Sequence, residues 1–296
     1  MTQLGESVSE GEIDLDEFKC PFEHTKPGQV NNALGSDSAA LGSRLAEGYS
    51  TQLWADEGAR IVPKTKQKLI AARRDDCPEP PVVVDGQEYP YSSSAHHLIP
   101  GEASLPKSTL IKFISEGAKG SKVWGDIGYD VNGGENGIWL PTHHALSSEM
   151  KEGLVLPGED RALKYSELTR RVKQRNEENQ VVATFQERFT GAIMERARRQ
   201  FHDAHPDYSA FVIKVLDKIQ MNLVEQSEAC GECGEVKKKK GKYPPPHGLV
   251  SRLNSVSARL YQFLVGPPQT WRPPLYTSRF AASLAQLERA WLQRRK

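Results

Sequence analysis

Two pairs of metal-type residues constrain the fold most, because they lie far apart in the chain and together suit one shared ion. The stretch "CPFEH" supplies Cys20 and His24 with C-x3-H spacing, and "CGEC" supplies Cys230 and Cys233 with C-x2-C spacing. Together they make a Cys₃His set, a common composition for a structural zinc site. The sequence therefore predicts a zinc ion that joins the N-terminal segment to the region after residue 226.

The cysteines also allow other interpretations. Cys77 can replace His24 as the fourth ligand, and the C-x2-C pair can instead be a redox pair or two unlinked buried thiols. Four cysteines in 296 residues argue against a disulfide-stabilised fold. Gly234, directly after Cys233, favours metal binding, because glycine permits the tight turn in which backbone amides face a thiolate sulfur.

Composition predicts a globular protein with a packed core, since 38% of the residues are hydrophobic and 26% are charged. No apolar run approaches the roughly 20 residues that span a bilayer, so we expect no membrane insertion. Residues 1–18 are polar and acidic and lack the layout of a signal peptide. We therefore expect a cytoplasmic location and no export by the general secretory route, while specialised secretion without a cleaved signal stays open.

The charge is unevenly distributed along the chain. Residues 161–296 hold 25 Lys and Arg against 13 Asp and Glu, which leaves 14 and 25 for residues 1–160. A basic half attracts polyanions such as nucleic acid, although the two halves can also neutralise each other. The run "KKKK" is a candidate phosphate-contacting loop, or simply a solvated one: Lys237, Lys238, Lys239 and Lys240.

Periodicity gives a coarse secondary structure. A short strand at Val82–Val84 should precede an Asp-Gly turn, and "GIWLP" at 137–141 should be a second strand. Apolar residues recur at helical spacing in several segments. The expected helices cover residues 37–60 with glycine interruptions, 107–117, a stretch around 185–193, 205–226, 249–265 and 277–294.

Six of the eight histidines fall into three clusters. These are His96 and His97 in "YSSSAHHLIP", His143 and His144 in "NGIWLPTHH", and His202 and His205 in "FHDAHPDY". Adjacent side chains do not share one face of a helix or strand, so the first two rings should have different roles. One division is a metal ligand and a general base. Taken alone, an adjacent pair more often has a structural or surface role.

In this order, "AHHLIP", "NGIWLP-x-HH" and "HPDY" resemble the AHH branch of the HNH/endonuclease VII superfamily. Its members are ββα-metal (His-Me finger) nucleases, common as toxin domains of bacterial polymorphic toxin and type VI secretion systems. The resemblance covers roughly residues 90–225. The family's segments are usually closer together than here, so the resemblance implies a helical insertion at about 150–200.

The resemblance implies roles for the motif residues. His97 would be the general base that takes a proton from the attacking water, and His96 would bind the catalytic metal. Asn136 would hold the loop and orient the base through hydrogen bonds. Either His143 or His144 would supply a second metal ligand.

The resemblance also implies roles for residues of the third cluster. His205 is a candidate third ligand or phosphate contact, and Tyr208 should pack beside it. His202 is expected to be an ordinary surface residue. Histidine ligands suit Zn²⁺ or Ni²⁺, and a well-hydrated site also accepts Mg²⁺ or Mn²⁺.

The expected fold is α+β, with a small ββα-metal motif embedded in a mainly helical domain and a structural zinc site. Three regions follow: an N-terminal segment (1–89) that contributes to the zinc site, a nuclease domain (90–228), and a C-terminal region (229–296). The last of these contains the C-x2-C pair, the basic loop and terminal helices.

The expected function is that of a metal-dependent, sequence-nonspecific DNase, a hydrolase that acts as an antibacterial toxin effector. By the resemblance, an immunity protein would protect the producing cell. The alternatives are an RNase or tRNase on the same scaffold, and a non-catalytic zinc-stabilised nucleic-acid-binding or adaptor protein.

Overall fold

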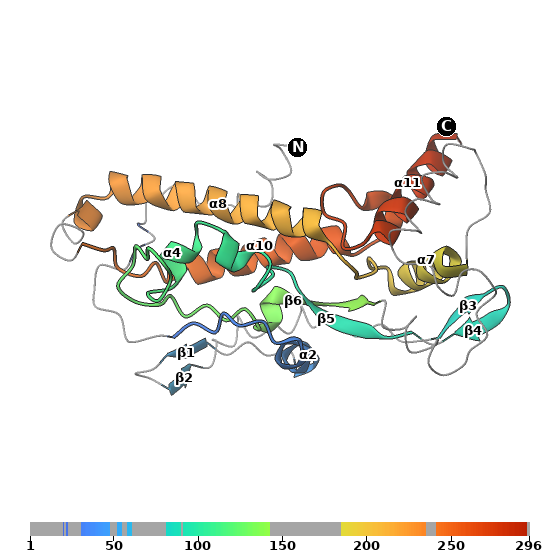
Figure 1. The fold of residues 1–296 in the computed structure, drawn as a ribbon, viewed down its shortest axis with the longest axis horizontal. Helices are drawn as coiled ribbons and strands as arrows, with labels where there is room; N and C mark the ends of the chain where they lie inside the picture. Colours follow the sequence, from blue (N-terminus) through green and yellow to red (C-terminus); the bar gives the residue numbers. More distant parts are fainter. Residues whose placement is uncertain are drawn as a thin grey trace. The chain divides into compact units, whose positions relative to one another are not determined.

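The computed structural model describes residues 20, 22, 31–47, 52–54, 58–60, 81–89, 91–142, 185–234 and 241–294. Its elements are α-helices, short 3₁₀ helices and two-stranded sheets (Figure 1). The predicted α+β class is therefore confirmed. Among the described helices, none is both long enough and apolar enough to cross a membrane.

The chain divides into two units, each built from three separate stretches. The first unit holds residues 1–76, 95–138 and 209–261, and the second holds 77–94, 139–208 and 262–296. Four of the five passages of the chain between the units fall within described elements: β5 (Ser93–His97), β6 (Gly137–Pro141), α8 (Pro206–Ala229) and α10 (Gly248–Leu264).

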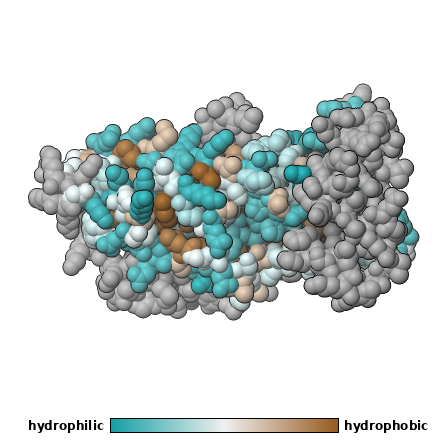
Figure 2. All heavy atoms as spheres, in the orientation of Figure 1, coloured by the Kyte–Doolittle hydropathy of each residue, from teal (hydrophilic) through white to brown (hydrophobic). Residues whose placement is uncertain are grey.

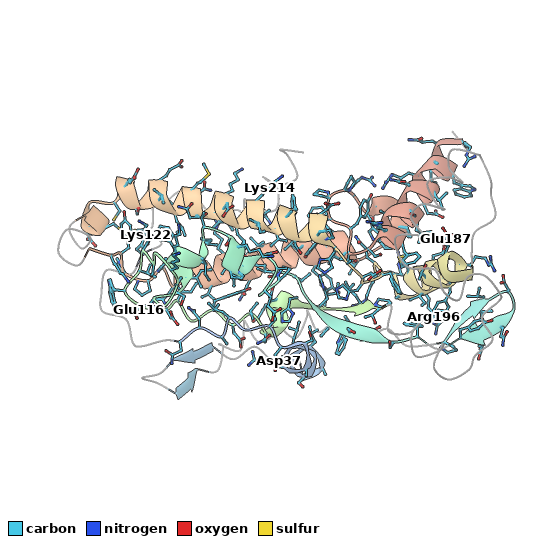
Figure 3. The ribbon with its side chains drawn as sticks, viewed as in Figure 1. Asp37, Glu116, Lys122, Glu187, Arg196 and Lys214 are labelled. Carbon is cyan, nitrogen blue, oxygen red and sulfur yellow. The ribbon has the colours of Figure 1, made fainter. Side chains whose placement is uncertain are left out.

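Helix α8 carries much of the core of the first unit. Its predicted apolar positions Phe211, Val215, Ile219 and Leu223 are all buried, whereas Lys214 is exposed to solvent (Figure 3). Pro206 suits the first turn of a helix, where a backbone N–H has no helical partner. The expected helix over 205–226 is therefore confirmed and extends to Ala229.

Helix α2 (Ser38–Glu47) begins at a side-chain cap. The carboxylate of Asp37 accepts hydrogen bonds from the backbone N–H groups of Ala39 and Ala40, both at 2.9 Å. The prediction that helix continues to residue 60 is wrong. Instead β1 (Gln52–Trp54) and β2 (Gly58–Arg60) form an antiparallel pair, consistent with the low helix propensity of the glycine in β2.

The expected helix over 107–117 is also wrong. The structure has a 3₁₀ turn, η1 (Leu105–Lys107), and a single helical turn, α4 (Ile111–Ile114). The physical reason lies in tertiary hydrogen bonds to the residues around α4. Asp217 accepts from both the backbone N–H and the hydroxyl of Thr109, and Asp126 accepts from the hydroxyl of Ser115. These bonds favour local geometries that interrupt a continuous helix.

The second unit contains a tight hairpin. Strands β3 (Val82–Val84) and β4 (Gln87–Tyr89) pair antiparallel, which confirms the predicted strand and turn. Asp85 and Gly86 both have positive φ values, 53° and 80°. That pair of conformations is the one that a two-residue hairpin requires, and it explains the Asp-Gly sequence.

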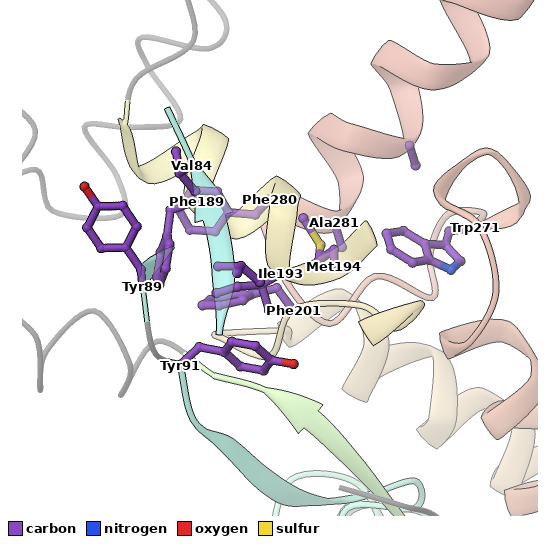
Figure 4. Packing of buried hydrophobic residues seen from close by; sticks show 12 residues of the cluster. Val84, Tyr89, Tyr91, Phe189, Ile193, Met194, Phe201, Trp271, Phe280 and Ala281 are labelled. Carbon is purple, nitrogen blue, oxygen red and sulfur yellow. The ribbon is translucent and has the colours of Figure 1, made fainter. Parts of the chain in front are cut away.

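An aromatic core stabilises this unit (Figure 4). Strand β3 contacts α7 (Phe185–Ala197), which in turn contacts α11 (Arg279–Arg294). Edge-to-face pairs join Tyr89 to Phe189 and Phe201 to Phe280, with ring centroids 6.0 and 5.7 Å apart. The last elements along the described chain are α10, η4 (Pro268–Thr270) and α11. They confirm the predicted helices over 249–265 and 277–294.

Strands β5 and β6 form the third two-stranded sheet. Backbone hydrogen bonds run from Leu98 N–H to the Asn136 carbonyl at 2.8 Å and from Thr142 N–H to the Ser92 carbonyl at 3.0 Å. Residue numbers rise on one strand as they fall on the other, so the pair is antiparallel. Strand β6 confirms the prediction for "GIWLP", and the 3₁₀ turn η2 (Gly134–Asn136) leads into it.

Gly137 marks a close approach between α2 and the start of β6. A Cβ atom at this position would lie 2.7 Å from the Leu41 side chain and 3.0 Å from that of Leu45. A side chain at this position would therefore displace the ends of these leucine side chains, and α2 packs directly beside the turn that precedes β6. On the face shown in Figure 2, hydrophilic residues cover most of the coloured surface.

Candidate metal and catalytic sites

Three histidines from different parts of the sequence come together. The ring nitrogens of His96, His202 and His205 lie within 4.8 Å of one another, an arrangement that can hold a metal ion. We call these three residues the histidine group. His96 and His205 were expected as ligands, whereas sequence reasoning placed His202 at the surface. The H-x-x-H spacing of His202 and His205 was the sequence feature that could have identified His202 as a ligand.

Local structure positions the second and third members. His202 is fixed by a 2.7 Å hydrogen bond from its backbone N–H to the carbonyl of Pro141. His205 directly precedes α8, and its ring meets that of the buried Tyr208 edge to face with centroids 5.5 Å apart. Tyr208 therefore packs beside His205, as the sequence predicted.

The rings of His202 and His205 face each other through their Nε2 atoms, which are 3.2 Å apart. Burial lowers the pKa of His205, although its own backbone and the Asp203 carboxylate act in the opposite direction. A lowered pKa keeps the imidazole neutral, and neutral imidazole is the form that binds metals. Three imidazoles are a donor set that suits Zn²⁺, Ni²⁺ and other divalent transition ions. The expected ligands His143 and His144 lie outside the described residues.

His97, next to His96, has different neighbours. Its Nε2 atom lies 2.9 Å from Oδ1 of Asn132. That oxygen also accepts the backbone N–H of Asp37 at 2.8 Å, and Nδ2 of the same amide donates to the Gly35 carbonyl at 2.9 Å. These partners fix which atom of the amide is the oxygen. Since an amide oxygen only accepts, we assign the His97 proton to Nε2, which leaves the Nδ1 lone pair to take a proton.

Burial also lowers the pKa of His97, which is only 9% exposed. The hydrogen bond to Asn132 and the carboxylates of Asp37 and Glu102 raise it, but by less. The ring is therefore neutral at pH 7 and able to accept a proton, the state that a general base needs.

Asn136 uses all of its hydrogen-bonding capacity within the protein. Its Oδ1 accepts from the backbone N–H of Ile99 at 2.7 Å and from the Ser257 hydroxyl at 2.9 Å. Its Nδ2 donates to the carbonyls of Ile99 and Val131 at 3.0 and 2.8 Å. The side chain thus holds the loop that follows His97. The ring of His97 itself is held by Asn132, which sequence reasoning missed although "DVNGGEN" contains both asparagines.

Three cysteines form a second group that can hold a metal ion. The sulfur atoms of Cys20, Cys230 and Cys233 lie within 4.8 Å of one another, and those of Cys20 and Cys233 are 3.4 Å apart. We call these residues the cysteine group. The two proposed fourth ligands, His24 and Cys77, lie outside the described residues, so both alternatives stay open.

Backbone amides surround Cys230 of this group. Burial raises the pKa of its thiol, but hydrogen bonds from the backbone N–H of Cys233, from the thiols of Cys20 and Cys233, and from the backbone N–H of Glu232 outweigh it. The net result is a lowered pKa. For Cys233 and Cys20, burial dominates and raises the pKa. The C-x2-C turn thus has the amide arrangement that was expected from the glycine after it.

The lysine run at 237–240 lies outside the described residues, so its two interpretations remain as the sequence left them. No family model, no curated protein and no solved structure matches this chain. The family resemblance therefore rests on the motifs of this sequence.

Proposed function

We propose that this protein is a metal-dependent endonuclease that hydrolyses phosphodiester bonds of DNA without sequence preference. The observation that best supports the proposal is the environment of His97. This imidazole is buried, has a lowered pKa, and has its Nε2 proton committed to Asn132. It therefore has one nitrogen lone pair available for base chemistry, and it directly follows a member of the histidine group.

The residues of the chain divide the work. His97 takes a proton from water through Nδ1, and the Asn132 carbonyl, which accepts the Nε2 proton, stabilises the imidazolium that forms. His96, His202 and His205 are the donors for a divalent ion. When bound, such an ion neutralises charge on the scissile phosphate and on the leaving 3′ oxygen.

We also propose that β5 and β6 are the two strands of a ββα-metal motif, joined through the turn that contains Asn136. The helix of the motif would carry His143 and His144, which lie outside the described residues. The family resemblance also supports a role as an antibacterial toxin effector with a cognate immunity protein, delivered by specialised secretion.

The decisive experiment compares His97→Ala with His247→Ala. His247 is buried to a similar degree and also hydrogen bonds through one ring nitrogen, to the Ile127 carbonyl, so it controls for the loss of a buried imidazole. Purified proteins are incubated with supercoiled plasmid and with total RNA, with and without chelator. We expect chelator-sensitive plasmid cleavage in the wild type and in His247→Ala, and its loss in His97→Ala.

Two outcomes would contradict the proposal. Unchanged plasmid cleavage by a folded His97→Ala variant would remove the base assignment. Cleavage of RNA but not of plasmid would make the protein an RNase at the same site. Expression in a bacterial cytoplasm tests the effector role, since toxicity should disappear in His97→Ala and persist in His247→Ala.

A further inference from the structure

The sulfur positions of the cysteine group fit one tetrahedral ion. With Zn–S bonds of about 2.3 Å, ligand sulfurs in a tetrahedral site lie roughly 3.8 Å apart. The 3.4 Å between Cys20 and Cys233, and the 4.8 Å limit that includes Cys230, bracket that value. A disulfide would need about 2.05 Å and would leave the third sulfur over, and all three residues are thiols.

Backbone amides lie where they can stabilise two of the sulfurs as thiolate ligands of a cation. Backbone N–H groups of Cys233 and Glu232 face the Cys230 sulfur, and the backbone N–H of Phe22 faces the Cys20 sulfur. Such amide hydrogen bonds stabilise a charged sulfur and orient it toward a cation. The donors are soft, which selects Zn²⁺ over Mg²⁺ or Ca²⁺.

Next to the cysteine group, an aromatic cluster anchors the same stretch of chain. Phe22 is buried, and its ring centroid lies 5.3 Å from that of Tyr243 and 6.3 Å from that of Phe113. Tyr243 is in turn fixed by a 2.7 Å backbone hydrogen bond to Lys122. Cys20 and Phe22 therefore attach the start of the described chain to elements that lie about 90 to 220 residues further on.

The described residues that follow continue this attachment toward His97. We call Cys20, Phe22 and residues 31–37 the N-terminal strap. Within it, the Asn32 side chain donates to the Ile114 carbonyl and accepts the Tyr129 N–H, both at 2.8 Å. At its far end, Asp37 donates its N–H to the amide oxygen that holds His97.

We propose that the cysteine group binds a structural zinc ion that fixes the N-terminal strap to the rest of the first unit. The zinc ion braces the end of the strap that is opposite to Asp37 and takes no part in the chemistry. The site is independent of the proposed nuclease activity, and its test needs no substrate.

The test uses the full-length protein reconstituted with Co²⁺. Thiolate ligation gives an intense sulfur-to-cobalt charge-transfer band that imidazole ligation does not give, so the histidine group cannot imitate it. We expect the band in the wild type and in His96→Ala, and its loss in the Cys230→Ser/Cys233→Ser double variant. Absence of the band in the wild type, or its persistence in the double variant, would reject the site.

A second measurement keeps the proposal testable if the double variant fails to fold. In the wild type, removal of zinc by a chelator should speed hydrogen exchange at residues 31–37 at least several-fold, while exchange in the β3–β4 hairpin stays unchanged. Equal exchange in the strap with and without zinc would overturn the structural role. A native Cys20–Cys233 disulfide detected by mass spectrometry would do the same.

Discussion

The cysteine group and the histidine group both bring three metal-type donors together, but they differ in donor chemistry. The cysteine group consists of sulfurs beside backbone amides and an aromatic cluster, features that suit a permanent structural ion. The histidine group consists of imidazoles, one with its pKa lowered by burial, and accepts several exchangeable ions. Under the two proposals, the sulfur donors serve stability and the nitrogen donors serve the hydrolytic chemistry.

Removing the sulfur ligands should give the largest effect. Structural zinc contributes on the order of 10 kcal/mol to folding in small zinc peptides, and each kcal/mol lost lowers Tm by about 2–4 °C in larger domains. We therefore expect the Cys230→Ser/Cys233→Ser variant to lose at least 10 °C in Tm, measured by calorimetry, together with one zinc ion per chain. A variant with unchanged Tm and zinc content would show that the cysteine group is not structural.

Removing a nitrogen ligand should instead reduce activity and leave stability nearly unchanged. Residues that merely support a metal ligand are worth about 10–100-fold, so we expect His205→Ala to lower plasmid cleavage by roughly 100-fold or more. The sulfur-to-cobalt band should remain at full intensity in this variant. If the band weakened together with cleavage, the two groups would not be separate sites, and the contrast between them would fail.

Asn136 gives a further test, because it supports the loop after His97 rather than either metal group. Asn136→Ala removes the amide to which the N–H of Ile99 and the other partners of Asn136 are hydrogen bonded. A buried donor left without an acceptor lowers the free energy of unfolding by about 1–3 kcal/mol. We expect a loss of about 2 kcal/mol in the free energy of unfolding, measured by denaturation. A change below 0.5 kcal/mol would mean that water replaces the amide fully. Metal content should be unaffected.

Sequence alone predicted the features that depend on local spacing. Helix α8 follows from apolar residues on one face, and the β3–β4 turn follows from Asp85–Gly86, whose conformation few other pairs adopt. The β1–β2 pair and the break between η1 and α4 were mispredicted. The break depends on hydrogen bonds from Thr109 to Asp217, 108 residues away, and single-sequence periodicity contains no information on such partners.

The candidate site shows the same division. The ligand types of the two pairs led to the grouping of Cys20 with the C-x2-C pair, and the family resemblance implied that Asn136 holds the loop. The sequence did not identify His202 as a ligand. The backbone of His202 is positioned by an isolated β-bridge to Thr142, and this places its ring beside that of His205. Nor did the sequence identify Asn132, because the choice between two nearby asparagines depends on which one Asp37 and Gly35 approach from nearly 100 residues away.

Asn132 supplies the smallest predicted effect and the sharpest test of the base. In the wild type, the lowered pKa of His97 means that cleavage should fall only as the pH drops below the ordinary histidine range. In Asn132→Asp, a carboxylate would face Nε2 and raise that pKa, so the acid limb of kcat/KM should move to higher pH by roughly one unit. Cleavage at pH 8–9, where the ring is neutral in both proteins, should change much less than at pH 6. Asn132→Ala removes the acceptor without adding charge, so its acid limb should not move upward. A pH profile that is the same in all three proteins would mean that His97 is not the group whose proton affinity controls cleavage.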